Sequence, residues 1–281
     1  MVKIISSIIQ FLLLAGTTLL LLFIVMSGSI DHAPIDKFYW IQADTSGISG
    51  APSISKWTFW GICSYEGGST NGNCDNLGPA YAFSPVDNFN TTTNVPTSFV
   101  DNRDTYYYLT RFSWVFYLIS LVFIGVSFIC WWFSGFIASM KFTLTFFTSL
   151  TLLLDTTATC CQTAAIVLGK NAFASSGLSS KLGPSMLGMA WASVACLILL
   201  SFETCFSAAR SSFLEHKQRH DLEKQQRDLY KADPEMGAFQ QAQVTQPNTA
   251  QNQGTLASNN EGGIRFFKIR RNNRTSDEES V

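Results

Sequence analysis

The chain has 281 residues, of which 47% are hydrophobic and 14% are charged, and its formal net charge at pH 7 is −1. Long stretches carry no charged residue, while the last third of the chain carries many. This pattern argues against a soluble enzyme and is typical of an integral membrane protein.

Four segments are apolar and long enough to cross a bilayer, whose hydrocarbon core requires about 20 residues of helix. They are residues 4–27, 112–133, 142–169 and 185–209. A helix is expected in each, because backbone amides in lipid must bond within their own segment. The sequence therefore predicts an all-α membrane protein with a bundle of four transmembrane helices. The first segment could instead be a cleaved signal peptide, but its apolar run exceeds the usual length of about 7–15 residues.

Basic residues near the spans indicate the orientation of the bundle. Lys3 precedes the first span, and the fourth is followed by a group of lysines and arginines, namely Arg210, Lys217, Arg219, Lys224, Arg227 and Lys231. We therefore expect residues 1–3, 134–141 and 210–281 to lie in the cytoplasm, and residues 28–111 and 170–184 to lie outside the cell.

The long outer loop, residues 28–111, is rich in turn-forming residues and in aromatics. A disordered loop would carry few aromatics, so a small packed domain, largely of strands and turns, is expected. Cys63 and Cys74 are the only cysteines in this loop, and an oxidising compartment favours a disulfide between them over two free thiols. Residues 56–63 are predicted to form one aromatic-rich strand, and residues 66–73 a hairpin tip. Asn90 begins a glycosylation sequon on the outer side.

Polar residues interrupt the third span near its middle. Asp155 is expected to cost at least about 2.5–3.5 kcal/mol on insertion scales, and Gln162 lies close by. Asp155 could serve an ion or proton site in a transporter, or it could face the bundle as a hydrogen-bonded structural residue. No basic residue lies at matching depth in another span, and a lone acid is weak evidence for transport.

Small residues and cysteines also mark the spans. The fourth span carries small residues at helical spacing, Ser185, Gly188, Ala192 and Cys196, which favour either a compact bundle or lateral self-association. Cys130 and Cys205 lie near cytoplasmic ends of spans, where S-palmitoylation is an alternative to simple packing.

The cytoplasmic tail has three parts. Residues 210–231 predict a polar helix that continues from the fourth span, and residues 238–260 are predicted to be disordered. The third part is a basic-aromatic run that comprises Arg265, Phe266, Phe267, Lys268, Arg270, Arg271 and Arg274. We expect this run to bind the anionic inner leaflet, and the alternative is a solvated tail. Ser276 precedes three acids and is a candidate phosphorylation site that would weaken such binding.

Enzymatic motifs are missing from the sequence. It contains no recognisable nucleophile–base pair, phosphate loop, nucleotide motif or zinc-ligand pattern. We therefore expect no enzymatic activity, no cofactor, no bound metal and no nucleic-acid partner.

A set of residues between the first two spans is similar to the claudin-type signature. The set consists of Trp57, Trp60, Gly61, Cys63 and Cys74. More specifically, the chain resembles the fungal Sur-seven/PalI family, and it is closest to the Sur-seven branch. The matching stretches are residues 27–32, 38–42, 84–90, 103–112, 170–173, 186–193 and 264–270.

This resemblance implies a protein of static, furrow-like plasma-membrane domains, the eisosome compartment. It further implies effects on cortical organisation, endocytosis, sphingolipid content, the cell wall and spore formation. The implied partners are eisosome proteins, other copies of the chain, and membrane lipids, among them sphingolipids or sterols. Two alternatives remain, an accessory or sensor subunit like the PalI branch and a small transporter that uses Asp155.

Overall fold

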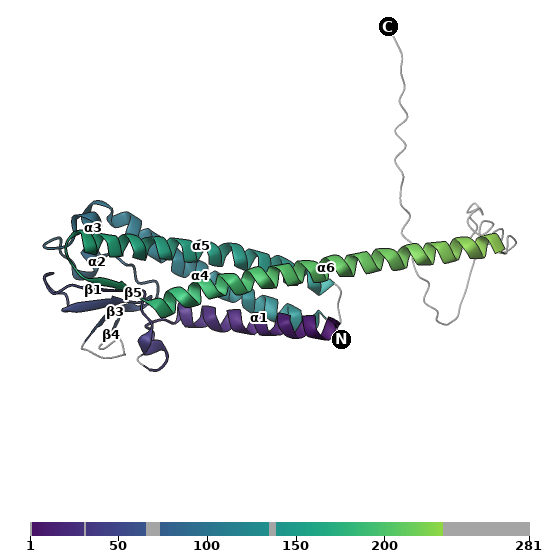
Figure 1. Cartoon of the computed structure of the whole chain (residues 1–281), viewed down its shortest axis with the longest axis horizontal. Helices are drawn as coiled ribbons and strands as arrows, with labels where there is room; N and C mark the ends of the chain where they lie inside the picture. Colours follow the sequence, from purple (N-terminus) through teal and green to yellow (C-terminus); the bar gives the residue numbers. More distant parts are fainter. Residues whose placement is uncertain (1, 31, 66–73, 135–138, 233–281) are drawn as a thin grey trace, which may run out of the picture. The chain divides into compact units, whose positions relative to one another are not determined.

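The computed structural model describes residues 2–30, 32–65, 74–134 and 139–232. The chain divides into two units, of which Met1–Asp221 holds the helix bundle and the sheet, and Leu222–Val281 begins with the last turns of the final helix. In the first unit, long helices lie side by side and the sheet packs at the end away from the N-terminus (Figure 1).

The elements confirm the predicted fold class, a bundle of four long apolar helices with a small sheet beside it. The long helices are α1 (Val2–Val25), α4 (Arg103–Phe133), α5 (Ser139–Ser175) and α6 (Pro184–Ala232). The short helical turns are η1 (Ile35–Lys37), α2 (Pro85–Phe89) and α3 (Thr97–Asp101), and the strands are β1 (Ile41–Asp44), β2 (Ile54–Trp57), β3 (Gly61–Ser64), β4 (Cys74–Asn76) and β5 (Ser180–Leu182).

The buried face of α4 combines small polar side chains with a few larger ones. Buried residues recur along α4 at intervals of three or four, as Tyr106, Thr110, Ser113, Tyr117, Ser120, Ile124, Ser127 and Cys130. The serines and Thr110 in this set are small enough to let α4 approach α5 closely, and α4 also packs on α1. In lipid, where apolar burial gives no driving force between helices, such close approach and interhelical hydrogen bonds hold a bundle together.

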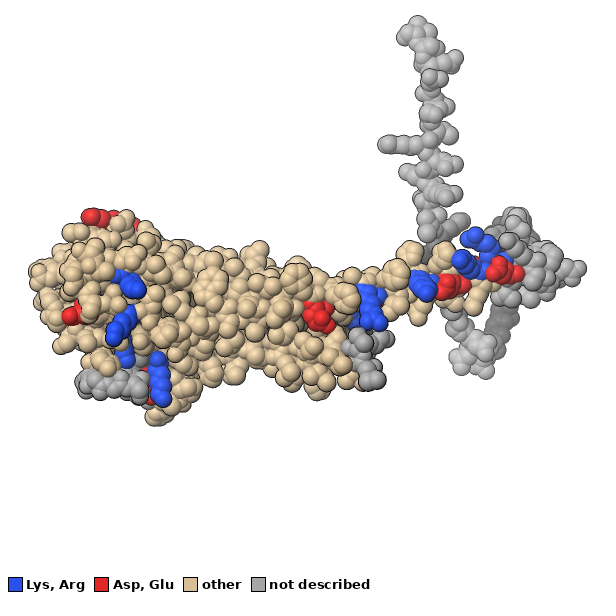
Figure 2. All heavy atoms as spheres, viewed as in Figure 1, with Lys and Arg blue, Asp and Glu red and all other residues tan. Residues whose placement is uncertain are grey.

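The outer surface of the bundle is apolar, as a lipid-facing surface must be. Exposed side chains of this belt include Phe112, Val122, Ile129, Trp132, Phe146, Leu153, Trp191, Leu199, Phe202 and Phe206. On the face that Figure 2 shows, a broad band without charged side chains separates the charged residues of the sheet end from those near the opposite end. The helices therefore present a belt suited to a bilayer.

The five strands form one antiparallel sheet in the order β4-β3-β2-β1-β5. One expectation is corrected here. Residues 56–63 are not one strand, because Thr58 turns the chain back and Trp57 of β2 pairs with Ile62 of β3. The sheet also extends beyond the first outer loop, since β5 from the second outer loop pairs with β1, with Ile41 opposite Leu182.

The helices also extend past the predicted spans on the outer side. The second span was expected to begin at residue 112, whereas α4 begins at Arg103, and α5 runs to Ser175 rather than to residue 169. These added turns form walls against which the sheet packs. Trp40 stacks on Tyr117 of α4 with ring centroids 6.3 Å apart, so the loop domain and the bundle share one core.

Gly183, between β5 and α6, should not tolerate a larger residue. Its amide donates to the Trp40 carbonyl at 2.8 Å, and a Cβ added there would lie 1.7 Å from the Tyr39 carbonyl oxygen. We expect Gly183→Ala to cost at least about 1–3 kcal/mol, because backbone must move. Gly188→Ala is the control, since nothing lies within 4 Å of that position. Heating the detergent-solubilised protein should show lower thermal stability for Gly183→Ala alone; equal stability of both variants would contradict the close approach.

Candidate functional site

The signature residues join the sheet to the end of the first long helix. The indole Nε1 of Trp60 donates to the Val25 carbonyl oxygen at 2.8 Å, which satisfies one of the free carbonyls at the end of α1. The Thr58 hydroxyl donates to the Gly61 carbonyl at 2.9 Å and so tightens the β2–β3 turn. Thr58 also lies close to Gly28, and only glycine leaves room for it, because a Cβ at position 28 would lie 2.1 Å from the Thr58 hydroxyl oxygen. The signature therefore fixes the sheet on the bundle.

Trp57 is the centre of the aromatic core of the loop domain. It is 2% exposed, and its Nε1 donates to the Asn88 side-chain oxygen at 2.8 Å. Its ring lies 5.2 Å from Phe83 and 6.0 Å from both Phe89 and Phe173, measured between centroids. Three parts of the chain that carry the family resemblance thus meet at Trp57. They are the signature, residues 84–90 and residues 170–173.

The predicted disulfide is confirmed. Cys63 of β3 and Cys74 of β4 lie directly opposite each other and are bonded. The bond closes the β3–β4 pair at the edge of the sheet. The predicted hairpin tip, residues 66–73, lies outside the described residues.

A second clamp fastens α2 to the start of α4. Arg103 donates from Nε and Nη2 to the Asp87 carboxylate at 2.7–3.0 Å, and the Ser84 hydroxyl donates to the same group at 2.5 Å. Burial alone would raise the pKa of Asp87, but the hydrogen bonds from Arg103 and Ser84 outweigh it and lower that pKa. In the sequence these two stretches carry only the family resemblance, and no local signal pairs Asp87 with Arg103.

This clamp makes the stability of the folded protein depend on pH in the acidic range. Because the folded-state pKa of Asp87 is depressed, its stabilising contribution is full above the unfolded pKa of about 3.9 and is lost as the pH falls through the folded value. We expect Asp87→Asn to weaken the acid dependence of the melting temperature between pH 7 and 3, with only a small loss at pH 7, since exposed pairs contribute little. Asp101→Asn is the exposed control. An unchanged acid profile for Asp87→Asn would contradict the assignment.

Lys56 is a buried cation that sequence reasoning missed. Its side chain is enclosed between two aromatic rings, with Nζ 4.9 Å from the Tyr39 centroid and 4.5 Å from the Tyr65 centroid. The residue is 3% exposed, and burial lowers the pKa of its ammonium group. Cation–π contacts of this kind compensate in part for desolvation. The sequence of β2 does not indicate that Lys56 is buried, because the strand lacks the alternation of buried and exposed residues that would mark its inner face.

Asn90 is placed where a glycan could be attached. It ends α2 in the left-handed conformation, with φ 49°, and it is exposed together with Thr92 of the sequon. Glycosylation of Asn90 stays a prediction.

Asp155 and Gln162 face the interior of the bundle in a polar seam along α5. The Ser193 hydroxyl of α6 donates to Asp155 Oδ2 at 2.8 Å, and the Ser113 hydroxyl of α4 donates to Gln162 Oε1 at 2.6 Å. Between them, Thr159 bonds the Tyr117 hydroxyl at 2.9 Å. These contacts join α5 to both neighbouring helices. The arrangement favours a structural role for Asp155, as helix-to-helix glue of the kind found in membrane bundles.

Asp155→Asn should therefore leave the protein nearly unchanged. Asparagine has similar volume and keeps an oxygen that accepts from Ser193, whereas Asp155→Leu leaves that buried hydroxyl without its side-chain acceptor on α5. We expect normal surface expression and thermal stability for Asp155→Asn, and lower stability for Asp155→Leu. A stably expressed Asp155→Asn protein that lost an ion- or proton-dependent phenotype would support the transporter alternative instead.

The remaining candidate residues differ in how accessible they are. The Cys205 thiol is exposed, whereas Cys130 is buried among the helices. Palmitoylation stays a prediction for both, and the buried position is the less accessible.

The basic-aromatic run from Arg265 to Arg274 and the site at Ser276 lie outside the described residues. Within the described ranges, no group of three or more histidines, cysteines or acids is positioned to hold a metal ion.

Comparisons with known proteins cover both the bundle and the loop domain. Protein SUR7 of Candida albicans is 41% identical over 280 residues, which span 99% of this chain and all of that protein. Protein SUR7 of Saccharomyces cerevisiae is 38% identical over 300 residues, spanning 99% of this chain and 98% of that one. The plasma membrane protein YNL194C of the same yeast is 33% identical over 68% of this chain and 64% of its own length. The SUR7/PalI family model matches residues 6–202. The chain therefore belongs to the SUR7/PalI family.

Proposed function

We propose that the protein is a structural organiser of furrow-like plasma-membrane domains, the eisosome compartment. The observation that carries this proposal is the full-length similarity to two SUR7 proteins, which covers the loop domain as well as the bundle. A plasma-membrane location is further supported by the name of the relative YNL194C and by four helices long enough to span a bilayer. Effects on endocytosis, sphingolipid content, the cell wall and spore formation would follow from such a role.

The geometry is compatible with a scaffold that acts through its surfaces. The loop domain shares its core with the bundle, so a contact made by the outer domain would act on both parts together. The small residues of α6 at Ser185, Gly188 and Ala192 are exposed and face away from the bundle interior. Of the two alternatives for this stripe, lateral self-association is therefore favoured over packing within one copy.

Imaging of the full chain in living fungal cells tests the organiser role. A fluorescent C-terminal tag should mark stable cortical patches at the plasma membrane, and patches bleached in one spot should recover slowly. Signal that is uniform and freely diffusing, or that is concentrated in internal compartments while the protein is intact, would contradict the proposal and favour a sensor or transporter.

A double variant tests the lateral association. Gly188→Leu with Ala192→Leu should block close helix approach and make the patches smaller or more mobile, without lowering thermal stability. Ile198→Leu, at another exposed position of α6, is the matched control. Unchanged patch size and mobility in the double variant would rule out this stripe as the contact.

A further inference from the structure

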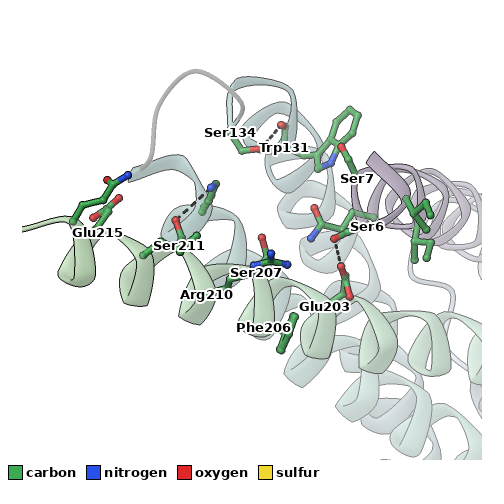
Figure 3. Close-up of a pocket in the computed structure, with 16 residues that line it drawn as sticks. Ser6, Ser7, Trp131, Ser134, Glu203, Phe206, Ser207, Arg210, Ser211 and Glu215 are labelled. Atoms are coloured by element: carbon green, nitrogen blue, oxygen red, sulfur yellow. Dashed lines mark hydrogen bonds between the residues drawn. The ribbon is translucent and has the colours of Figure 1, made fainter. Parts of the chain in front are cut away.

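A cavity of about 750 Å³ opens between all four long helices at the end of the bundle that we assign to the cytoplasm. Figure 3 shows its lining, with Ser6 from α1, Trp131 from α4, and Glu203, Arg210 and Glu215 from α6. The size is typical of a binding pocket for a small ligand. None of the signature residues of the outer domain lies here.

The cavity is lined by two basic and two acidic side chains. Arg210 and Lys141 supply the positive charges, and Glu203 and Glu215 supply the negative ones. Because the charges balance, the cavity is complementary to a ligand that itself carries one charge of each sign. A headgroup with several phosphates would instead place its excess negative charge against the two acids.

Several of these charged groups have spare capacity for a ligand. Among the described residues Arg210 forms no ion pair, and Lys141 makes one long contact, 3.3 Å from Nζ to the Ser211 hydroxyl. The Ser6 hydroxyl donates to Glu203 Oε1, while Oε2 has no hydrogen-bond donor in the described part of the chain. This bond links α1 to α6 across the cavity and positions the carboxylate (Figure 3).

The cavity adjoins the surface that faces lipid. Phe206 lines it and is 66% exposed as part of the apolar belt, and Trp131 lines it from α4. Tryptophan and basic residues at this level are typical of the interface between headgroups and acyl chains. A lipid could therefore place its headgroup in the cavity while its acyl chains remain beside the belt.

We infer that the cavity binds the headgroup of phosphatidylethanolamine from the inner leaflet. The phosphate accepts hydrogen bonds from Arg210 and Lys141, and the primary ammonium donates to Glu203. Glu215 is twelve residues further along α6, about 18 Å at 1.5 Å per residue, and contributes only negative charge at the other end of the cavity. Choline has no N–H to donate to the Glu203 carboxylate, and the extra carboxylate of a serine headgroup meets Glu203 with like charge. This inference does not depend on the proposed organiser role, because it concerns one copy of the chain and one lipid.

Lipid retention by the purified full-length protein tests the inference. The protein in detergent is titrated with phosphatidylethanolamine, phosphatidylcholine, phosphatidylserine or a bisphosphorylated phosphatidylinositol, and bound lipid is measured by native mass spectrometry. Phosphatidylethanolamine should bind roughly tenfold more tightly than phosphatidylcholine, as expected from one charge-assisted hydrogen bond gained. Soluble glycerophosphoethanolamine should bind far more weakly, and equal affinity would overturn the assignment to a lipid.

Two variants test the phosphate and ammonium contacts separately, and two others are controls. Arg210→Gln should weaken binding of both phosphatidylethanolamine and phosphatidylcholine, because it removes a phosphate donor. Glu203→Gln keeps an acceptor for Ser6 and should abolish only the preference for ethanolamine over choline. Arg219→Gln and Asp221→Asn, exposed residues of α6 outside the cavity lining, are the matched controls.

The inference is overturned by any of three results. Equal affinity for all lipids would mean a nonspecific annulus, and preference for the inositol or serine lipid would mean a different ligand class. An Arg210→Gln protein that retains lipid as well as Arg219→Gln would place the bound lipid elsewhere. Thermal stability and elution volume without added lipid, measured for each variant, show whether a loss of binding arises from loss of fold.

Discussion

Trp57→Ala is expected to destabilise the protein by about 3–5 kcal/mol, the cost typical of removing a large buried aromatic. The side chain is 2% exposed and contacts Phe83, Phe89 and Phe173, so its removal leaves a cavity between β2, α2 and α5. It also leaves the Asn88 side-chain oxygen without the indole donor. The variant should melt at much lower temperature in detergent and accumulate in internal membranes rather than at the cell surface.

Two further substitutions make the Trp57 result specific. Trp57→Phe keeps an aromatic ring but removes the hydrogen bond to Asn88, so a smaller loss is expected. Trp132→Ala removes a tryptophan of the apolar belt that is 65% exposed, and stability should change little. A Trp57→Ala protein as stable as Trp132→Ala would show that the aromatic cluster is not the core of the outer domain.

Breaking the disulfide should have the second largest effect. Cys63→Ser and Cys74→Ser are each expected to cost about 3 kcal/mol, because both free the same short loop between β3 and β4. The double variant should be no less stable than either single one, since the two changes remove one bond. Thermal stability of the solubilised protein and the amount that reaches the cell surface measure the effect.

Cys160→Ser is the control for the disulfide series, because its thiol is free and exposed and no modification is predicted for it. It should match the unmodified protein in both measurements. Clearly unequal losses for Cys63→Ser and Cys74→Ser, or a double variant much worse than both, would mean that each cysteine also contributes separately. The single variants are compared under reducing conditions as well, so that the remaining thiol cannot form new bonds.

Hydropathy predicted the bundle because it reports the environment of a helix directly. For the same reason it does not report where α4 and α5 end outside the membrane. Arg103 and the residues that follow it belong to the helix but contact the loop domain rather than lipid, and their polar character hides this. A scale that measures transfer into a membrane gives the limits of the membrane, and not the limits of the helix.

The sheet was only partly predictable from the sequence. Cysteines and aromatics indicated a folded, disulfide-bonded loop, but β5 has three residues and no alternating pattern of its own. Its place in the sheet is set by pairing with β1, which lies about half of the chain away in sequence, and no local signal encodes this pairing. The enclosure of Lys56 by Tyr39 and Tyr65 has the same origin, since residues distant in sequence meet only after the strands pair.

The cavity residues were visible in the sequence only as separate features. Glu203 and Arg210 read as charges near the end of a span, and Ser6 as one polar residue in the first span. Their meeting depends on how α1 and α6 converge, which is a matter of helix packing rather than composition. A charged residue near a helix end is more often simply at the interface, so the sequence alone favours no pocket.

The pairing of β1 with β5 sets an order for biogenesis. β1 leaves the ribosome early, but its outer partner follows only after two further spans have been made. Until then β1 presents an open edge in the secretory compartment, where unpaired strands are prone to bind other chains. Completion of the sheet thus reports that the second and third spans, α4 and α5, have been inserted, and a quality-control receptor that binds the open edge could retain the unfinished chain.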